Sequence, residues 1–410
     1  MTDSIINLGV VGLGRAFSLM LPTFTRDNRF RLVAAATPGA PGRKAFEQDL
    51  GGRAYENVEG LCGDDEVTAV YVASPHEFHC EHIIQLAEAG KHLLVDKPLA
   101  VSESEAQQIV SVVERTGVVL VTGPSHSFDA PVLLARKLIE SGEFGALKQI
   151  HAVYHTDFLY RPRRGAELDT EQGGGVIFSQ GVHQVDVARF LAGGRIRSVH
   201  ALTGAWDPKR PTEGAYSALV EFEEGAFAAL TYNGYGRFPG DVLMEDISEL
   251  GFAVDPASYG GARRRHQAGA EQSEAEQKRQ RNLGFADTRA LMNKTPISHE
   301  HFGLVIASCE GADIRLHPDG VEVFADTRRR IRLMPPGIPR REVMDELHAA
   351  VAKAVPPVHD ARWGMASLEG AIAILESARS RAPVLLKHQC ALASHWQSIY
   401  TEPEIFHHQQ

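Results

Sequence analysis

The sequence predicts an α/β domain built on a parallel sheet, followed by an α+β domain with a large, open and mostly antiparallel sheet. Over residues 1–125, apolar strand-like runs alternate with amphipathic helical segments, the pattern of a parallel sheet wound with helices. From residue 126 onward, short turns join the runs, which is typical of antiparallel pairing. The chain has 410 residues, 43% of them hydrophobic, which is enough for two separate cores.

The first domain is expected to contain five strands. They cover residues 5–11, 31–36, 69–73, 92–95 and 118–122. Between the third and the fourth, residues 81–89 place apolar side chains at helical spacing and stop at Gly90, which favours a helix end. Strands connected through helices pair in parallel, so residues 1–125 are the expected first domain.

The second domain, residues 126–410, is expected to mix helices with hairpins. Helices are predicted at 132–141, 180–191, 341–354 and 363–380, and strands at 147–156, 197–206, 216–222, 226–232 and again near residue 304. Glu223-Glu224-Gly225 has the composition of a hairpin loop. Residues 251–299 break the pattern with glycine-rich and charged sequence, and we interpret them as an insertion, either a flap or an oligomer contact.

Composition narrows the partners and the compartment. A formal charge of −10 argues against nucleic acid as the main partner, and no apolar run approaches the roughly 20 residues that span a membrane. The first residues carry no basic segment of the secretory type. The cysteines (Cys62, Cys80, Cys309 and Cys390) are widely separated, which favours reduced thiols. We therefore expect a cytoplasmic protein with a small-molecule substrate, and a homo-oligomer because open sheet faces often pair.

A glycine-rich turn follows the first strand. Gly12-Leu13-Gly14-Arg15-Ala16 supplies the first two glycines of a G-x-G-x-x-G fingerprint and opens a helix, although Phe17 takes the third glycine position. Such a turn lets the backbone approach a pyrophosphate, whose charge is met by amides at the helix N-terminus. The first domain is therefore expected to be a Rossmann domain that binds NAD(P).

The end of the second strand bears on the choice of cofactor. An acidic residue that would hold the adenine ribose is replaced there by Thr37-Pro38, and Arg43 and Lys44 follow shortly. Without a carboxylate to repel a 2'-phosphate, NADP is chemically plausible. NAD can also bind through other ribose contacts, so the sequence leaves NAD and NADP as alternatives.

The segment Gly90–Ala100, with Asp96-Lys97-Pro98 at the end of the fourth strand, resembles the glucose-fructose oxidoreductase and inositol dehydrogenase (Gfo/Idh/MocA) family. The hallmark of that family is a Glu-Lys-Pro triplet. In this sequence Asp96, whose side chain is one methylene shorter, takes the place of the glutamate. The other matching features are the glycine turn, Ser74-Pro75 with His79, Gly173-Gly174-Gly175, and then His183 with Asp186. The resemblance covers most of the chain outside the insertion.

The resemblance implies a hydride transfer at a carbon that carries a hydroxyl, catalysed by an NAD(P)-dependent oxidoreductase acting on CH-OH or CH-CH donors. It implies that Lys97 contacts the nicotinamide and the substrate oxygen, and that His183 is catalytic. The expected cofactor-binding positions are Gly12, Leu13, Gly14, Arg15, Ala16, Thr37, Arg43, Ser74, Pro75, His79, Asp96 and Lys97. A histidine suits removal of the hydroxyl proton, and a lysine stabilises the developing alkoxide.

Substrate contacts are expected from several segments. Asp186 corresponds to a substrate-facing aspartate of the family, whereas Ser179 replaces the aspartate usually found four residues before the histidine. A hydroxyl there would hold His183 in a charged form less strongly than a carboxylate would. The full expected set is Lys97, Tyr160, Arg161, Arg163, Arg164, Ser179, His183 and Asp186, with Tyr232, Asn233 and Arg237 on neighbouring segments. Arginine forks suit carboxylates, although a solvated charge run is the alternative for the loop 161–164.

Within the family, the chain length, the run from Ser179 to Asp186 and the long insertion are most similar to phthalate 4,5-cis-dihydrodiol dehydrogenases. That reaction of aromatic catabolism takes a hydride from one carbinol carbon of a cis-diol, and the hydroxy-ketone then tautomerises to a catechol. A sugar, inositol or related polyol dehydrogenase is the second hypothesis. A dinucleotide-binding regulator without turnover is the third, and the presence of both Lys97 and His183 disfavours it.

One cluster of metal-ligand residue types is present. His76, His79, Cys80 and His82 lie close together in sequence. They also match the family's loop and helix start after the third strand, and no acidic partner accompanies them. We therefore predict no metal site.

Overall fold

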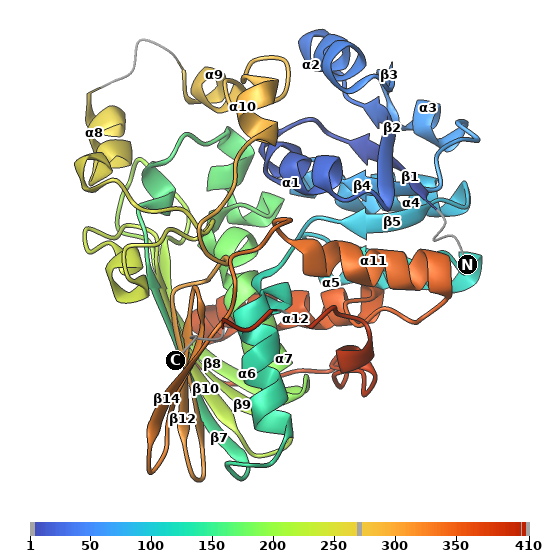
Figure 1. The fold of residues 1–410 in the computed structure, drawn as a ribbon. Coiled ribbons are helices and arrows are strands. Elements are labelled where there is room, and N and C mark those ends of the chain that lie inside the picture. The colour runs from blue at the N-terminus through green and yellow to red at the C-terminus, as the bar shows by residue number, and fades with distance from the viewer. Residues whose placement is uncertain (1–4, 269–272, 403, 407–410) are drawn as a thin grey trace. The chain divides into compact units, whose positions relative to one another are not determined.

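The computed structural model describes residues 5–268, 273–402 and 404–406 (Figure 1). These residues divide into two compact units. The described parts of Met1–Pro124, Gln272–Thr295 and Gly337–Met365 form the first unit, and those of Ser125–Glu271, Pro296–Pro336 and Ala366–Gln410 form the second. No helix in the described part of the chain is long and apolar enough to cross a membrane.

The first unit contains a parallel sheet of six strands in the order β3-β2-β1-β4-β5-β6. Its strands are β1 (Ile6–Val11), β2 (Phe30–Ala36), β3 (Arg53–Tyr55), β4 (Ala69–Val72), β5 (His92–Val95) and β6 (Leu120–Thr122). β4 is buried on both faces, as expected of a parallel sheet covered by helices. The predicted parallel sheet is confirmed, with β3 as an additional short edge strand.

Helices connect these strands. They are α1 (Arg15–Arg26), α2 (Ala40–Ala45), α3 (Val58–Cys62), α4 (His79–Glu88) and α5 (Glu103–Thr116), with α11 (Arg341–Lys353) added from later in the chain. Local sequence sets the limits of α5, because the Ser102 hydroxyl accepts the Glu105 N–H at its start and Gly117, with φ 71°, ends it. Phe17, in the third glycine position, is fully buried on α1 between the rings of Phe24 and Phe46.

The second unit contains a nine-stranded sheet in the order β14-β13-β12-β11-β7-β10-β9-β8-β15. Its strands are β7 (Leu147–His155), β8 (Ile196–Gly204), β9 (Ala215–Phe222), β10 (Phe227–Asn233), β11 (Leu304–Cys309), β12 (Asp313–His317), β13 (Gly320–Phe324), β14 (Arg328–Arg332) and β15 (Val384–Leu385). β7 and β10 pair in parallel and the other neighbours are antiparallel, so the predicted mostly antiparallel sheet is confirmed.

Helices cover one face of this sheet (Figure 1). They are α6 (Ala130–Glu140) and α7 (Val182–Ala192), and α12 (Ala361–Ser380) runs from the first unit into the second. All eleven residues of α7 are buried, and a π-helical turn, Ile177–Gly181, precedes it. A buried helix of this kind holds its polar side chains in fixed positions, which matters for His183 and Asp186.

The expected insertion, 251–299, does not form one body. Its first part contains α8 (Gly261–Gln267) in the second unit, and its later part contains α9 (Glu274–Arg279) and α10 (Thr288–Met292) in the first. Residues 269–272 lie outside the described residues. The first segment of the first unit ends at Pro124, and the described parts of 272–295 and of 337–365 also belong to that unit. The reason is packing: α10 lies on α1, and Asp345 of α11 pairs with Arg29 at 2.7 Å.

Candidate functional site

The glycine turn lies where β1 and β4 end side by side. Gly12 has φ 89°, and a Cβ there would fall 2.7 Å from the carbonyl oxygen of Ala73, so only glycine fits. Gly14 then precedes α1 without any side-chain cap on the helix N-terminus. Backbone amides at such a helix end are suited to a pyrophosphate. The residues present therefore fit a dinucleotide, as the sequence predicted.

The other predicted cofactor positions of the first unit also follow the carboxyl ends of strands. Thr37 follows β2 and donates its N–H to the carbonyl of Tyr55, and Arg43 donates to the carbonyls of Thr37 and Pro38 at 2.8 Å. Ser74 follows β4, and Asp96 and Lys97 follow β5. The strand order reverses between β1 and β4, which is where parallel sheets bind their ligands.

His79 is a correction to the predicted cofactor contacts. Its side chain has no exposed surface, and its ring nitrogens lie 2.9 Å from the carbonyl oxygen of Pro98 and 3.0 Å from that of Ser74. A fully buried ring cannot touch a dinucleotide. His79 instead ties the loop after β4 to the turn after β5. Because both nitrogens face carbonyl groups, the ring is not arranged to bind a metal either.

Asp96 is coupled to the lysine that follows it. Its Oδ1 accepts the backbone N–H of Lys97 at 2.9 Å. Burial raises the pKa of Asp96, and the positive charge of Lys97 opposes this. The carboxylate therefore fixes the backbone at Lys97, whose predicted contacts with nicotinamide and substrate stay predictions.

In the second unit, three consecutive residues, 125–127, contact side chains of α7. Ser125 places its hydroxyl 3.4 Å from Nδ1 of His183, the ring centroids of His126 and His183 are 4.7 Å apart, and Ser127 donates a short hydrogen bond to Asp186. The other carboxylate oxygen of Asp186 accepts from Ser367 at 2.7 Å. Asp186 is buried by these serines, so its contacts within the protein position α7, and its predicted substrate contact stays a prediction.

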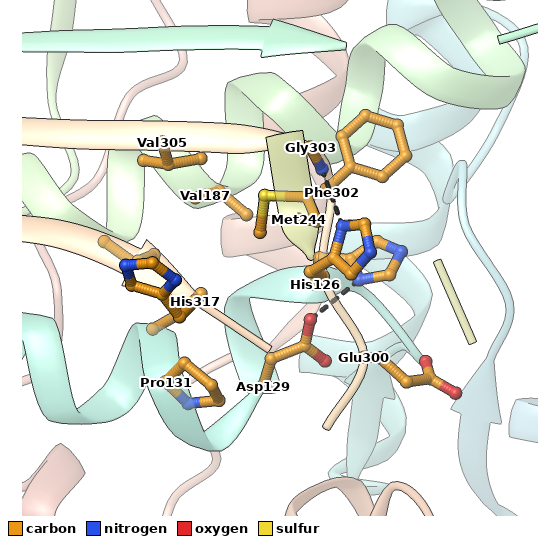
Figure 2. Close-up of a pocket in the computed structure, with 13 residues that line it drawn as sticks. His126, Asp129, Pro131, Val187, Met244, Glu300, Phe302, Gly303, Val305 and His317 are labelled. Carbon is orange, nitrogen blue, oxygen red and sulfur yellow. Dashed lines mark hydrogen bonds and ion pairs between the residues drawn. The ribbon is translucent and has the colours of Figure 1, made fainter. Parts of the chain in front are cut away.

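His126 carries a charge network that sequence reasoning missed. Its Nδ1 lies 2.7 Å from Asp129, drawn in Figure 2, and its Nε2 lies 3.7 Å from Glu249. Burial alone would lower the pKa of His126, but Asp129 and Glu249 outweigh it and raise the pKa to about 10. An imidazolium therefore stands beside His183 at neutral pH.

His301 shows the opposite behaviour close by. Its Nε2 lies 2.8 Å from the carbonyl oxygen of Ile247, and its Nδ1 accepts the N–H of Gly303. Burial lowers the pKa of His301 to about 4, so this ring is neutral. His126, His301 and Phe302 share the wall of a cavity of about 20 Å³, which is room for a water molecule or two rather than a substrate (Figure 2).

Two carboxylate–histidine groups among the described residues bring their ligand atoms within 4.8 Å of one another. They are His126 with Asp129 and Glu300, and Glu245 with His317 and Asp319. In the first group, Asp129 already holds His126 as a charged ring, which is a poor metal ligand. In the second, Arg330 pairs with both Glu245 and Asp319. Each group therefore contains residues already held in an ion pair within the protein.

The predicted arginine loop divides into two kinds of residue. Arg163 stacks 3.5 Å from the centroid of Phe158 and donates to its carbonyl, and Arg164 lies 3.5 Å from Glu167, so both stiffen the loop. Arg161 is exposed to the same extent as Arg164, 36% against 35% of the side chain, but its charge also interacts with Glu249, Asp157, Tyr232 and Tyr154. Arg161 therefore brings an accessible cation to the same polar centre as His126.

The remaining predicted residues of the second unit vary in placement. Tyr160 lies among aromatic neighbours, with ring centroids 6.3 Å from Tyr235 and 5.8 Å from His266. Tyr232 is buried in a row of rings, 6.0 Å from Phe302. Ser179 is partly exposed on the π-helical turn before α7. Their substrate contacts stay predictions.

Comparison with known proteins places the chain among the dinucleotide-dependent oxidoreductases. The family profile described as "Oxidoreductase family, NAD-binding Rossmann fold" matches residues 6–123, and that of the GFO/IDH/MocA C-terminal domain matches residues 132–242. The chain belongs to the Gfo/Idh/MocA family and is an NAD(P)-dependent oxidoreductase acting on CH-OH donors.

Individual relatives sharpen this assignment. The 1-carboxy-3-chloro-3,4-dihydroxycyclohexa-1,5-diene dehydrogenase of Comamonas testosteroni is 42% identical over 377 residues, 91% of this chain and 95% of the relative. Inositol 2-dehydrogenase 2 of Saccharopolyspora erythraea is 32% identical over 60% of this chain and 72% of the relative. A crystal structure from Bordetella bronchiseptica RB50 superposes with a TM-score of 0.87 at 38% identity, covering 93% of this chain and 100% of that one.

Proposed function

We propose that the protein oxidises one carbinol carbon of a cis-diol on a carboxylated cyclohexadiene ring. The observation that carries this proposal is the 42% identity, over nearly the whole chain, to a dehydrogenase whose name specifies a carboxylated dihydroxycyclohexadiene. Phthalate 4,5-cis-dihydrodiol, which the sequence predicted, has the same chemistry. The accessible guanidinium of Arg161 supports an anionic substrate, because arginine binds carboxylates through paired hydrogen bonds.

The proposed reaction moves a hydride from the carbinol carbon to the cofactor and a proton from its hydroxyl to the protein. The bound NAD(P)+ supplies the hydride acceptor. His183 takes the proton of the reacting hydroxyl, while Lys97 stabilises the negative charge that develops on its oxygen. The hydroxy-ketone that forms then tautomerises: the remaining carbinol carbon loses its C–H proton, the ketone oxygen gains a proton, and the ring becomes a catechol. Aromatisation makes the second step strongly favourable, so the diol is drawn towards oxidation.

His126 gives His183 its proposed protonation state. A base must be neutral before it can accept a proton, and the imidazolium of His126 disfavours a second positive charge on the adjacent ring. Asp129 and Glu249 hold that positive charge on His126. We propose that His126 is a positioning residue, which keeps His183 ready as the base near neutral pH.

An inositol or related polyol dehydrogenase is the second candidate. The relative from Saccharopolyspora erythraea supports it, at lower identity and over less of the chain. Ser179 argues against it, because the family's sugar-oxidising members were expected to carry an aspartate at that position.

A turnover screen separates these candidates. Carboxylated cis-dihydrodiols, an uncarboxylated cis-dihydrodiol, myo-inositol and hexoses would each be offered with NAD+ and NADP+, and reduced cofactor measured by absorbance. We expect the carboxylated diols to give the highest kcat/KM and a catechol product. A higher kcat/KM with inositol or a hexose would contradict the proposal. Comparing the rates with NAD+ and with NADP+ shows which of the two cofactors the protein uses.

We also propose a cytoplasmic homo-oligomer. No disulfide joins Cys62, Cys80, Cys309 or Cys390, which suits a reducing compartment. Leu202, Leu219 and Phe227 are exposed on one face of the strands β8, β9 and β10, between polar residues such as Ser217 and Glu221, and a mixed face of this kind is suited to a second copy of the chain. Light scattering after size exclusion would test this, and a monomer at micromolar concentration would contradict it.

A further inference from the structure

Residues 273–295, which we call the strap, run along the nucleotide-binding domain although they lie more than 250 positions after the glycine turn. Figure 1 shows α10 of the strap beside α1. The sequence suggested only a flap or an oligomer contact for this region. Its actual position raises the question of what it does at the cofactor site.

The strap is fastened at both ends of α1. Near the helix N-terminus, the Ser18 hydroxyl donates to the carbonyl of Arg281 at 3.0 Å, and the Leu283 N–H donates to the carbonyl of Leu13 at 3.1 Å. At the helix C-terminus, Arg26 donates to the carbonyls of Met292 and Lys294. A segment held at both ends has a defined position on the domain.

The middle of the strap also fits closely against α2. Gly284 has φ 89°, and a Cβ there would lie 2.5 Å from the carbonyl oxygen of Pro41. A Cβ at Gly42 would lie 3.4 Å from the carbonyl oxygen of Leu283 and 3.5 Å from the Thr37 side chain. The strap therefore borders the end of β2, where a Rossmann domain holds the adenine ribose.

Asn282 faces the glycine turn itself. A Cβ at Gly14 would lie 3.9 Å from its Oδ1, and its side-chain amide makes no hydrogen bond within the described ranges. Gly12, Gly14, Arg15 and Ala16 keep part of their surface exposed with the strap in place. The strap therefore borders the pyrophosphate position and leaves the turn open.

We propose that the strap is the outer wall of the dinucleotide site, with the Asn282 side chain turning its NH2 group to donate to the pyrophosphate and the backbone at Leu283 bordering the adenine ribose. The proposal rests on NAD(P) binding and is independent of the substrate. A nearby pair of cations is consistent with it. Burial and the charge of Arg15 lower the pKa of Lys294 on the strap, and an anion bound beside them would relieve that repulsion.

The first test is Asn282→Ala, with Asn293→Ala as its control. Asn293 is an exposed asparagine on the same strap, at the end of α10. Calorimetric titration with NAD(P)+ and with ADP-ribose should show both dissociation constants raised roughly tenfold by Asn282→Ala, the cost of one hydrogen bond to a charged group. Asn293→Ala should stay within twofold of the wild type. An Asn282→Ala protein within twofold for both ligands would overturn the proposal.

The second test displaces the strap. Gly284→Ala places a Cβ against Pro41, whereas Gly337→Ala meets nothing within 4 Å and serves as its control. We expect a larger loss of ADP-ribose affinity for Gly284→Ala than for Asn282→Ala, with an unchanged circular dichroism spectrum. If Gly284→Ala does not fold, Asn282→Ala decides alone, since it leaves the backbone bonds intact.

A third measurement needs no variant. Arg279 and Arg289 are exposed on the strap, so trypsin can cut after them. ADP-ribose should slow both cleavages, and equal rates with and without ligand would overturn the proposal. None of these tests uses a substrate, so a wrong diol assignment leaves them unaffected. A wild type that binds no dinucleotide would instead contradict the cofactor.

Discussion

The two units build their sites in different ways. In the first, Gly12, Ser74 and Lys97 each follow the strand that positions them, so order along the sequence already indicates order across the sheet. In the second, the polar centre joins His126, His183 and Glu249, which come from three distant segments. Site residues that directly follow strands can therefore be predicted from local sequence. Site residues that come from distant segments can be identified only from the tertiary structure.

The largest expected effect is a loss of kcat when the proposed catalytic residue of either unit is removed. Lys97→Ala and His183→Ala should each lower kcat by about 10²–10⁴-fold, the usual contribution of a charge-stabilising or acid–base group. The melting temperature should change little for Lys97→Ala, whose side chain is partly exposed, and should fall for His183→Ala, which removes a buried ring packed against His126 and Phe302, so rates are compared well below both melting temperatures. Initial-rate kinetics and thermal unfolding would check this.

The controls for these variants are exposed residues of the same type. Lys353→Ala at the end of α11 and His200→Ala on β8 should retain normal turnover. Near-normal rates in both Lys97→Ala and His183→Ala would remove the proposed mechanism from both units.

A smaller effect sharpens the account of the second unit. Replacing His126 with glutamine removes the positive charge beside His183 but keeps a polar side chain. His183 would then hold its proton to higher pH, so the acidic limb of the kcat/KM profile should move upward by about one pH unit. His200→Gln is the matched control. A profile that moves downward or stays in place would show that His126 does not act through its charge.

The smallest effect concerns stability. The pKa of His126 is raised in the folded protein to about 10, from 6.5 in the unfolded chain. Its contribution is therefore fully present below pH 6.5 and is lost as pH rises through 10. Between pH 7 and pH 9 this loss is roughly 2–3 kcal/mol in unfolding free energy. Denaturant unfolding at both pH values should show a steeper decline for the wild type than for His126→Gln; equal declines would contradict the assignment.

The predictability of the molecule follows the same division. Short-range patterns predicted both sheets, the helix that carries His183 and the turn at Gly12, because hydrophobic period and glycine placement determine them locally. Glu249 and His301 could not be predicted in this way, because their roles depend on contacts with His126 and Ile247, which lie far away in the sequence. The loop arginines were ambiguous for a related reason: only their tertiary contacts separate Arg161 from Arg163.

The insertion shows a further limit. Its composition indicated neither a core nor a helix face, so sequence could not assign residues 273–295 to the first domain. Their position depends on backbone hydrogen bonds, such as that from Leu283 to Leu13, and on close glycine contacts that many sequences could make. His79 illustrates the converse, because a predicted ligand contact proved to be a buried link between two loops.

The most direct test varies the carboxylate of the substrate and Arg161 of the protein together and measures kcat/KM. The kcat/KM values of a carboxylated cis-dihydrodiol and its uncarboxylated counterpart would be compared in the wild type and in Arg161→Gln. We predict that the wild type prefers the carboxylated diol by about 10–100-fold, and that Arg161→Gln removes most of that preference by raising KM. A preference that Arg161→Gln leaves unchanged, or a wild type without one, would contradict the account.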